Sequence, residues 1–257
     1  TCTAYEYIKN SIPSLETSIT RYYDIFPSSG KYTGYVSDAT IGEFYNSLLC
    51  NACDPHTILG GVSSTSSTNS QSTVSTDSNI KSGSSPISGM RSAESIGIVA
   101  FKHDKLVGEL DAIETICFHI LKNNINSFII TVPSPKDNTF KIDLLVTPKG
   151  TCKTKVDIVN GSPYVKINGS FNAKIYSMDE DKNYLDCDFL DSLSNTCNIY
   201  LENVLLNYLY KTSLEFKSDI SGIGKYALSN FSTTSEFKDF NWSNNYMNST
   251  FNVNINT

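Results

Sequence analysis

The feature that most constrains the fold is period-two alternation across the second half of the chain. In "TFKIDLLVTP", apolar residues occupy every second position from Phe140 to Val146. The stretches "SFIITVP", "KTKVDIV" and "YVKINGSFNAKIYSM" have similar β-rich patterns. Alternation with polar partners indicates one buried and one solvated face, which is typical of an antiparallel sheet. In the last stretch we expect these core-facing side chains: Val165, Ile167, Phe171, Ala173 and Ile175.

A long amphipathic helix is predicted after these strands, from about Leu190 to Phe216. Its apolar residues recur at intervals of three or four and form a single stripe. The stripe comprises Leu190, Leu193, Cys197, Leu201, Val204 and Tyr208. At about 1.5 Å per residue, such a helix is long enough to cross a whole sheet. A short helix in "GKYALSNF" and a terminal strand in "FNVNIN" are expected to follow.

The first half predicts helices and one hairpin. A short helix is expected after Pro13, in "SLETSITRYYDIF". "DATIGEFYNSLLC" reads as a second helix, capped by Asp38 or Thr40. Its predicted buried stripe is Ile41, Phe44, Leu48 and Leu49.

The stretch "IGIVAFKHDKLVGEL" contains two β-rich runs separated by Lys-His-Asp-Lys. It fits a hairpin in which the carboxylate of Asp104 bonds the backbone of the turn. Asp111 is the natural cap of the helix that follows, and Glu114 completes a capping box. The inward side chains expected in that helix are Ile113, Ile116, Cys117 and Ile120.

Together these segments predict an α+β fold, with a mostly antiparallel sheet that carries helices packed on one face. We expect a smaller mixed domain over residues 1–110 and a C-terminal α+β domain over residues 111–257. Within the first, residues 63–90 are rich in Ser and Thr, and the stretch "SSTSSTNSQSTVSTDSN" is nearly all small hydroxyl and amide residues. Such a stretch buries too little apolar surface to offset the entropy of ordering, so it is predicted to be a flexible loop.

Charge and hydropathy exclude two classes. The formal net charge is −6 and no local basic cluster occurs, so nucleic acid is not an expected partner. No apolar run approaches the ~18 residues of a membrane span, and no signal peptide opens the chain. Strand-like patterns at both raw ends lead us to expect a fragment of a longer protein.

No catalytic, cofactor or metal site can be assembled from the sequence. His103-Asp104 could be a hydrolase metal dyad, but its place in a hairpin favours a solvated turn. Cys50 and Cys53 form a lone C-x-x-C, which could be redox-active or half a zinc site, but packing at a helix end is the favoured interpretation. "SGIGK" departs from the phosphate-loop spacing. "DEDKNYLDCD" lacks the central Gly of a calcium loop and is predicted to be an acidic surface loop.

Three stretches carry a family resemblance, and two of them contain its most specific motifs. One is "IGIVAFKHDKLVGELDAIET" and the other is "FKSDISGIGKYALSNF", which leads to the closing "FNVNIN". With "TGYVSDATIGEFYNSLLCNACDPHTILGGV", they resemble the C-subunit lipoprotein of GerA-type bacterial spore germinant receptors, without its N-terminal domain. The matched positions taken as structural or docking residues are Phe101, Asp104, Lys105, Gly108, Lys217, Ser218, Asp219, Gly222 and Gly224.

The resemblance implies a non-enzymatic subunit that takes part in triggering spore germination. It implies docking to integral-membrane A and B subunits at the outer face of the spore inner membrane. It also implies a lipid anchor outside this chain, since no signal peptide precedes Cys2. Whether such a subunit contacts the nutrient stays open.

Two alternatives to this function remain. One is a metal-dependent hydrolase that uses His103 and Asp104. The other is an extracytoplasmic solute-binding module, suggested by the acidic composition and the 15 tyrosines.

Overall fold

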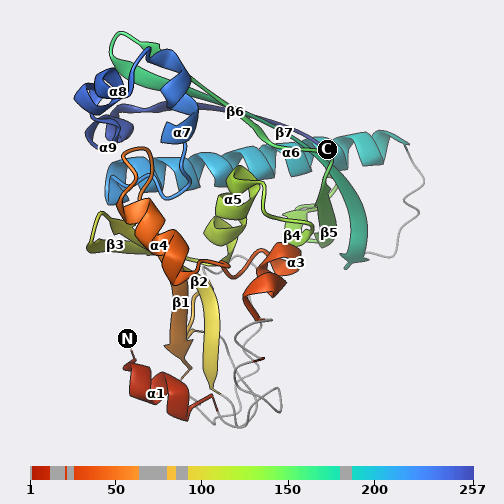
Figure 1. The fold of residues 1–257 in the computed structure, drawn as a ribbon. Helices are drawn as coiled ribbons and strands as arrows, with labels where there is room; N and C mark the ends of the chain where they lie inside the picture. Colours follow the sequence, from red (N-terminus) through yellow and green to blue (C-terminus); the bar gives the residue numbers. More distant parts are fainter. Residues whose placement is uncertain (1, 12–20, 22–25, 64–79, 85–91, 180–186) are drawn as a thin grey trace.

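The structure, a computed structural model, describes residues 2–11, 21, 26–63, 80–84, 92–179 and 187–257. Figure 1 shows two sheets, with helices lying between and around them. The helix expected after Pro13, the acidic loop and most of the Ser/Thr-rich loop lie outside the described residues. None of the described helices is long and apolar enough to cross a membrane.

The first sheet has three antiparallel strands in the order β1-β2-β3. They are β1 (His56–Val62), β2 (Ala93–Lys102) and β3 (Lys105–Leu110). Strand β1 was not predicted, because Gly60 and Gly61 interrupt any alternation. The structure explains these glycines, because other parts of the chain pack closely against their backbone. A Cβ on Gly61 would lie 2.7 Å from the backbone carbon of Ser82, and one on Gly60 would lie 3.1 Å from the ring of Tyr7.

The second sheet has five strands, and it contains the stretches that the alternation predicted. They are β4 (Phe128–Pro133), β5 (Lys141–Pro148), β6 (Lys153–Val159), β7 (Ser162–Met178) and β8 (Thr250–Asn256). The first half of β7 lies between β6 and β8, and its second half pairs with β5. Only the β7–β8 pair is parallel. The predicted α+β class with mostly antiparallel pairing is therefore confirmed.

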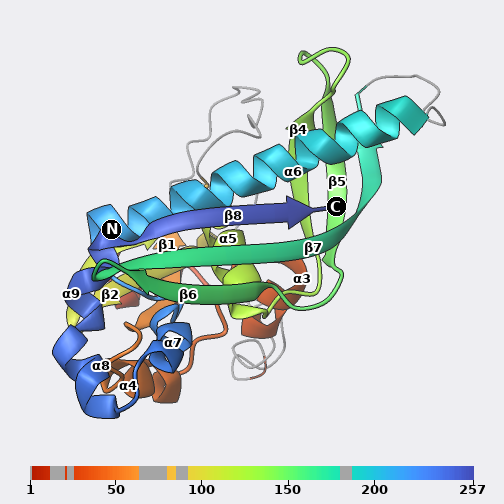
Figure 2. The same cartoon turned by 90° about the horizontal axis from the view of Figure 1, so that it is seen from above.

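Two helices contribute many of the buried side chains of the core. They are α5 (Ala112–Lys122) and α6 (Cys187–Tyr210), which continues as a π-helical turn, Lys211–Phe216. Figure 2 shows α6 running alongside β8 over the length of the molecule. Side chains of α6 also accept hydrogen bonds from backbone amides at the end of β8. Glu202 accepts a hydrogen bond from the amide of Ile255 at 2.9 Å, and Asn198 accepts one from Thr257 at 3.0 Å.

Short helices complete the fold. They are α1 (Ala4–Lys9), α3 (Gly30–Thr33), α4 (Ile41–Leu48), α7 (Gly224–Ala227), α8 (Thr234–Phe240) and α9 (Trp242–Asn245). Three 3-10 turns, Phe26–Ser29, Leu228–Asn230 and Tyr246–Asn248, accompany them. Helices α8 and α9 were not predicted. One hydrophobic cluster joins residues of the first sheet, such as Ile98, to residues of the second, such as Ile167. The domain boundary at residue 110 stays a prediction.

Some predicted core positions are wrong. In α4, Ile41 is 79% exposed and Leu49 is 82% exposed. Only Phe44 and Leu48 of that stripe are partly buried, because α4 packs through the contact of Phe44 with Phe101. Other core predictions that fail are exposed side chains of β7 and α6, namely Ala173, Ile175 and Leu190. In β7 the reason is that the covered part of the strand ends at Phe171.

Candidate functional site

The tip of the β2–β3 hairpin places His103 and Asp104 in a two-residue turn. Lys102 pairs with Lys105, and His103 adopts a left-handed conformation with φ 54°. The predicted hairpin is confirmed, but the predicted role of Asp104 is not. Within the described residues, Asp104 is exposed and makes no hydrogen bond. The amide of His103 instead donates to Oδ1 of Asp54 at 3.2 Å.

The segment after α6 packs directly against the base of this hairpin. The hydroxyl of Ser218 is buried and donates to the carbonyl of Phe101 at 2.6 Å. The ring of Phe216 lies against Gly108, so closely that a Cβ there would overlap it. Lys217 takes a left-handed conformation (φ 53°) and points an exposed side chain outward. The two family-like stretches are therefore one structural unit.

Asp219 is the buried centre of this unit, with only 1% of its surface exposed. Its Oδ1 accepts from the amide of Ile223 at 3.0 Å. Its Oδ2 accepts from the amide of Gly224 at 2.7 Å and from Nε1 of Trp242 at 2.9 Å. Burial raises the pKa of Asp219 to about 6, against the opposing effect of these donors. The carboxylate thus organises the turn that leads into α7.

The glycines of this turn have distinct roles. Gly222 has φ 74°, a left-handed conformation that side chains other than glycine adopt with strain. Gly224 is held by close approach, because a Cβ there would lie 2.6 Å from the carbonyl oxygen of Ala52 and 2.5 Å from Nε1 of Trp242. Both positions are buried.

Asp54 holds the whole arrangement together. Its Oδ2 accepts from the amide of Asp219 at 3.0 Å, while its own amide donates to the carbonyl of Asp219 at 2.9 Å. Its side chain is only 6% exposed. Together with the bond to His103, Asp54 links the hairpin tip to the turn after α6. Sequence reasoning missed Asp54 and Trp242. Pro55 marked the end of a helix, but no pattern indicated a carboxylate that serves distant amides.

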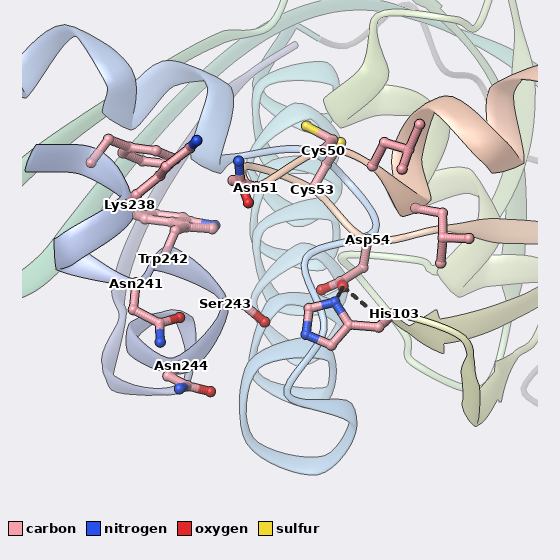
Figure 3. Close-up of a pocket in the computed structure, with 13 residues that line it drawn as sticks. Cys50, Asn51, Cys53, Asp54, His103, Lys238, Asn241, Trp242, Ser243 and Asn244 are labelled. Atoms are coloured by element: carbon pink, nitrogen blue, oxygen red, sulfur yellow. Dashed lines mark hydrogen bonds and ion pairs between the residues drawn. The ribbon is translucent and has the colours of Figure 1, made fainter. Parts of the chain in front are cut away.

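A pocket of about 230 Å³ opens above this network (Figure 3). Its polar lining comprises Asn51, Asp54, His103, Lys238, Asn241, Ser243 and Asn244, and its apolar lining includes Leu49 and Trp242. Lys102 contributes a hydrogen bond from Nζ to the carbonyl of Ser243 at 3.2 Å. Among the described residues, the hydroxyl of Ser243 is buried without a hydrogen-bond partner. The pocket can therefore both donate and accept hydrogen bonds.

The structure does not support the metal-dependent hydrolase alternative. The side chain of His103 is 64% exposed, and its Nδ1 lies 3.9 Å from Oδ1 of Asp54. In the part of the chain that the structure describes, no cluster of three or more His, Cys, Asp or Glu could hold a metal ion. Cys50 and Cys53 line the pocket as free thiols.

The fold and the motif unit match a known class of protein. The family model described as "Spore germination B3/GerAC like, C-terminal" matches residues 96–257. The chain belongs to this family of spore-germination proteins, the germinant-receptor C-subunit family. The matched region covers the hairpin, the turn after α6 and the terminal strand β8.

A solved structure has the same fold. It is the crystal structure of the GerBC protein, which superposes with a TM-score of 0.52 at 21% sequence identity. The match covers 64% of this chain and 51% of that one, so the chain matches about half the length of that protein. A search of curated proteins found no match.

Proposed function

We propose that the chain acts as a non-enzymatic C subunit of a nutrient germinant receptor and contributes to triggering spore germination by protein–protein docking. Family membership supports the receptor role. The docking role rests on one observation. The family-like residues Ser218, Asp219 and Gly224 are buried in contacts within the chain, so the side chains available for recognition lie around them on the surface.

The docking surface that we propose is the hairpin-tip face, defined by Tyr45, Leu49, Leu106, Asp104 and Lys105. The first three are apolar or aromatic and are 60–82% exposed. They lie close together because Leu49 and His103 line one pocket, and because Leu106 pairs with Phe101, whose ring meets that of Phe44 at 5.2 Å. Exposed large apolar side chains rimmed by charge are typical of protein–protein interfaces.

The partners of this surface, on the proposal, are the integral-membrane A and B subunits of the receptor. The complex would lie at the outer face of the spore inner membrane, where a lipid anchor of the subunit adds membrane affinity. An anchor and a docking surface act together, since anchoring raises the local concentration of the subunit around its partners.

The test is co-purification of the subunit with the A and B subunits from spore membranes. Leu49→Asp combined with Leu106→Asp places two charges on the hairpin-tip face. We expect loss of co-purification and a slower germination response. The matched control is Tyr176→Asp, an equally exposed position near the end of β7, away from α4 (Figure 2). Normal assembly of the double variant, or equal loss in the control, would contradict the proposal.

The pocket favours a second candidate, the solute-binding module. It is concave, and it combines Asp54 and Lys238 with three asparagine amides. Small-molecule sites combine such polar groups with apolar walls. Calorimetry of the purified chain against amino acids and sugars tests this candidate. Binding that Asn244→Ala weakens would support it, since Asn244 is an exposed lining residue, and no heat across the set would count against it.

A further inference from the structure

Two cysteines of the C-x-x-C stretch meet at the wall of the pocket. Cys50 is partly buried and Cys53 is buried, and both line the pocket. Figure 3 shows the two sulfur atoms side by side, above the carboxylate of Asp54. The proposed docking function makes no use of these thiols.

We propose that Cys50 and Cys53 are a redox modification site, at which a peroxide oxidises the two thiols to a reversible intramolecular disulfide. The geometry carries the inference, because the two-residue spacing, the neighbouring placement of the two sulfur atoms and their shared position in the pocket wall coincide. The proposal is independent of the receptor function.

The chemistry balances with a peroxide as the oxidant. The Cys50 thiolate attacks one peroxide oxygen, the O–O bond breaks, and Cys50 becomes a sulfenic acid while hydroxide leaves. The sulfur of Cys53 then attacks the sulfur of Cys50, and the S–O bond breaks. The protons of the two thiols leave with the two oxygen atoms as water. Two thiols are thus oxidised by two electrons, and one hydrogen peroxide is reduced to two waters.

The order of attack follows from burial. Cys50 is the more accessible thiol, and the amide of Ala52 donates to its sulfur at 3.4 Å. The pKa of Cys53 is raised to about 12, first by burial and then by the neighbouring thiol of Cys50. Cys53 therefore suits the second step, in which it resolves the sulfenic acid.

The position of the pair indicates a modification site and not a thiol–disulfide catalyst. Catalytic C-x-x-C cysteines gain reactivity at a helix N-terminus, where the helix dipole stabilises a thiolate. Cys50 instead follows the C-terminal end of α4, where the partial charge is negative. We therefore expect slow oxidation, with a product that persists until a reductant is supplied.

The disulfide would act on the hydrogen bonds that Asp54 makes to the hairpin tip and to the turn after α6. Cys53 directly precedes Asp54, whose carboxylate holds the amides of His103 and Asp219. A bond between Cys50 and Cys53 fixes the segment that presents this carboxylate. Oxidation is therefore expected to affect the position of the hairpin tip through Asp54, without any large rearrangement.

The experiment treats the full chain with hydrogen peroxide, quenches it in acid, unfolds it, alkylates free thiols and maps them by mass spectrometry. The expected result is joint loss of alkylation at Cys50 and Cys53, with a mass lower by two hydrogen atoms and full recovery on adding dithiothreitol. Cys187, an exposed cysteine, serves as an internal control for the dose of oxidant. Alkylation of both Cys50 and Cys53 at a dose that oxidises Cys187 would overturn the proposal.

Two variants separate the steps. In Cys53→Ser, a sulfenic acid at Cys50 should persist and react with dimedone. In Cys50→Ser, Cys53 should stay as unreactive as the buried thiol of Cys117. Oxidation of Cys50 to sulfinic acid in the unsubstituted chain, while Cys53 stays free, would also overturn the proposal. That readout does not depend on the folding of either variant.

Discussion

Asp54 and Asp219 exchange hydrogen bonds across 165 positions of the chain. Oδ2 of Asp54 accepts from the amide of Asp219 at 3.0 Å, and the amide of Asp54 donates to the carbonyl of Asp219 at 2.9 Å. Both residues are buried. Because Asp54 leads into β1 and Asp219 follows the π-helical turn at the end of α6, this pair fastens the first sheet to the C-terminal third of the chain.

Asp54→Ala should destabilise the protein strongly. The substitution removes the acceptor of two amides, and the amide of Asp219 is buried. A buried donor left without a partner costs about 1–3 kcal/mol, so a loss of roughly 2–4 kcal/mol is expected. Urea unfolding measures it. Asp104→Ala, at the exposed turn, is the matched control and should stay within about 0.5 kcal/mol of the unsubstituted chain. Equal effects would contradict the assigned role of Asp54.

Gly224→Ala should cost about 3 kcal/mol of unfolding free energy, because overpacking against backbone is not relieved by a rotamer change. The added Cβ would lie 2.6 Å from the carbonyl oxygen of Ala52. Gly42→Ala is the contrasting change, since the nearest atom to its Cβ is 3.9 Å away in the exposed helix α4. It should stabilise the chain by up to about 1 kcal/mol through helix propensity. Thermal unfolding of both variants, with shifts of opposite sign, is the measurement.

Local patterns predicted much of the fold. The alternation in "TFKIDLLVTP" predicted β5, and Ile142, Leu144 and Val146 are buried as expected. The capping box of Asp111 and Glu114 predicted the start of α5, and the amide of Glu114 donates to Asp111 at 2.8 Å. These predictions succeed because strand periodicity and helix caps depend on neighbours in the sequence.

The candidate site depends on contacts that no local pattern encodes. The family-like residues of the hairpin and of the turn after α6 were identified from the sequence, but their partners Asp54 and Trp242 were not. A carboxylate that binds an amide 165 positions away leaves no periodic signal. The stripe of α4 failed for a related reason. An apolar stripe indicates only that a helix face is suited to burial. Leu49 is exposed, so within the described residues no other part of the chain covers that end of the stripe.

The carboxyl of Asp219 should titrate near pH 6. Burial raises its pKa from the ordinary 3.8 to about 6 in the folded state. Between these values the folded chain holds a proton that the unfolded chain has lost, so this group's contribution to stability falls as pH rises from 3.8 to 6. Carboxyl carbon shifts measured by NMR test the prediction. A resonance that vanishes in Asp219→Asn and titrates below pH 4 would contradict it.

His56 should act in the opposite direction and make the protein sensitive to acid. The ring is buried against Phe118, with centroids 4.6 Å apart, and burial lowers its pKa from 6.5 to about 3, assisted by the positive charge of Lys122. As pH falls below 6.5, the unfolded chain binds a proton that the folded chain does not, so stability is lost by about 1.4 kcal/mol per pH unit until pH 3 is approached.

His56→Gln removes this titration, so its unfolding free energy should fall less steeply with acid than that of the unsubstituted chain. Urea unfolding at about pH 7.5, 6, 5 and 4 spans the window of the pKa shift and measures, for each chain, how the unfolding free energy depends on pH. Above pH 7 the histidine is neutral in both states, so the slopes should coincide there even if the variant is less stable overall. The contribution of Asp219 to stability rises as pH falls over part of the same range. Only the difference in unfolding free energy between the two chains therefore isolates the effect of His56. Parallel slopes from pH 6 to 4 would show that the folded chain takes up a proton at His56 as readily as the unfolded chain does.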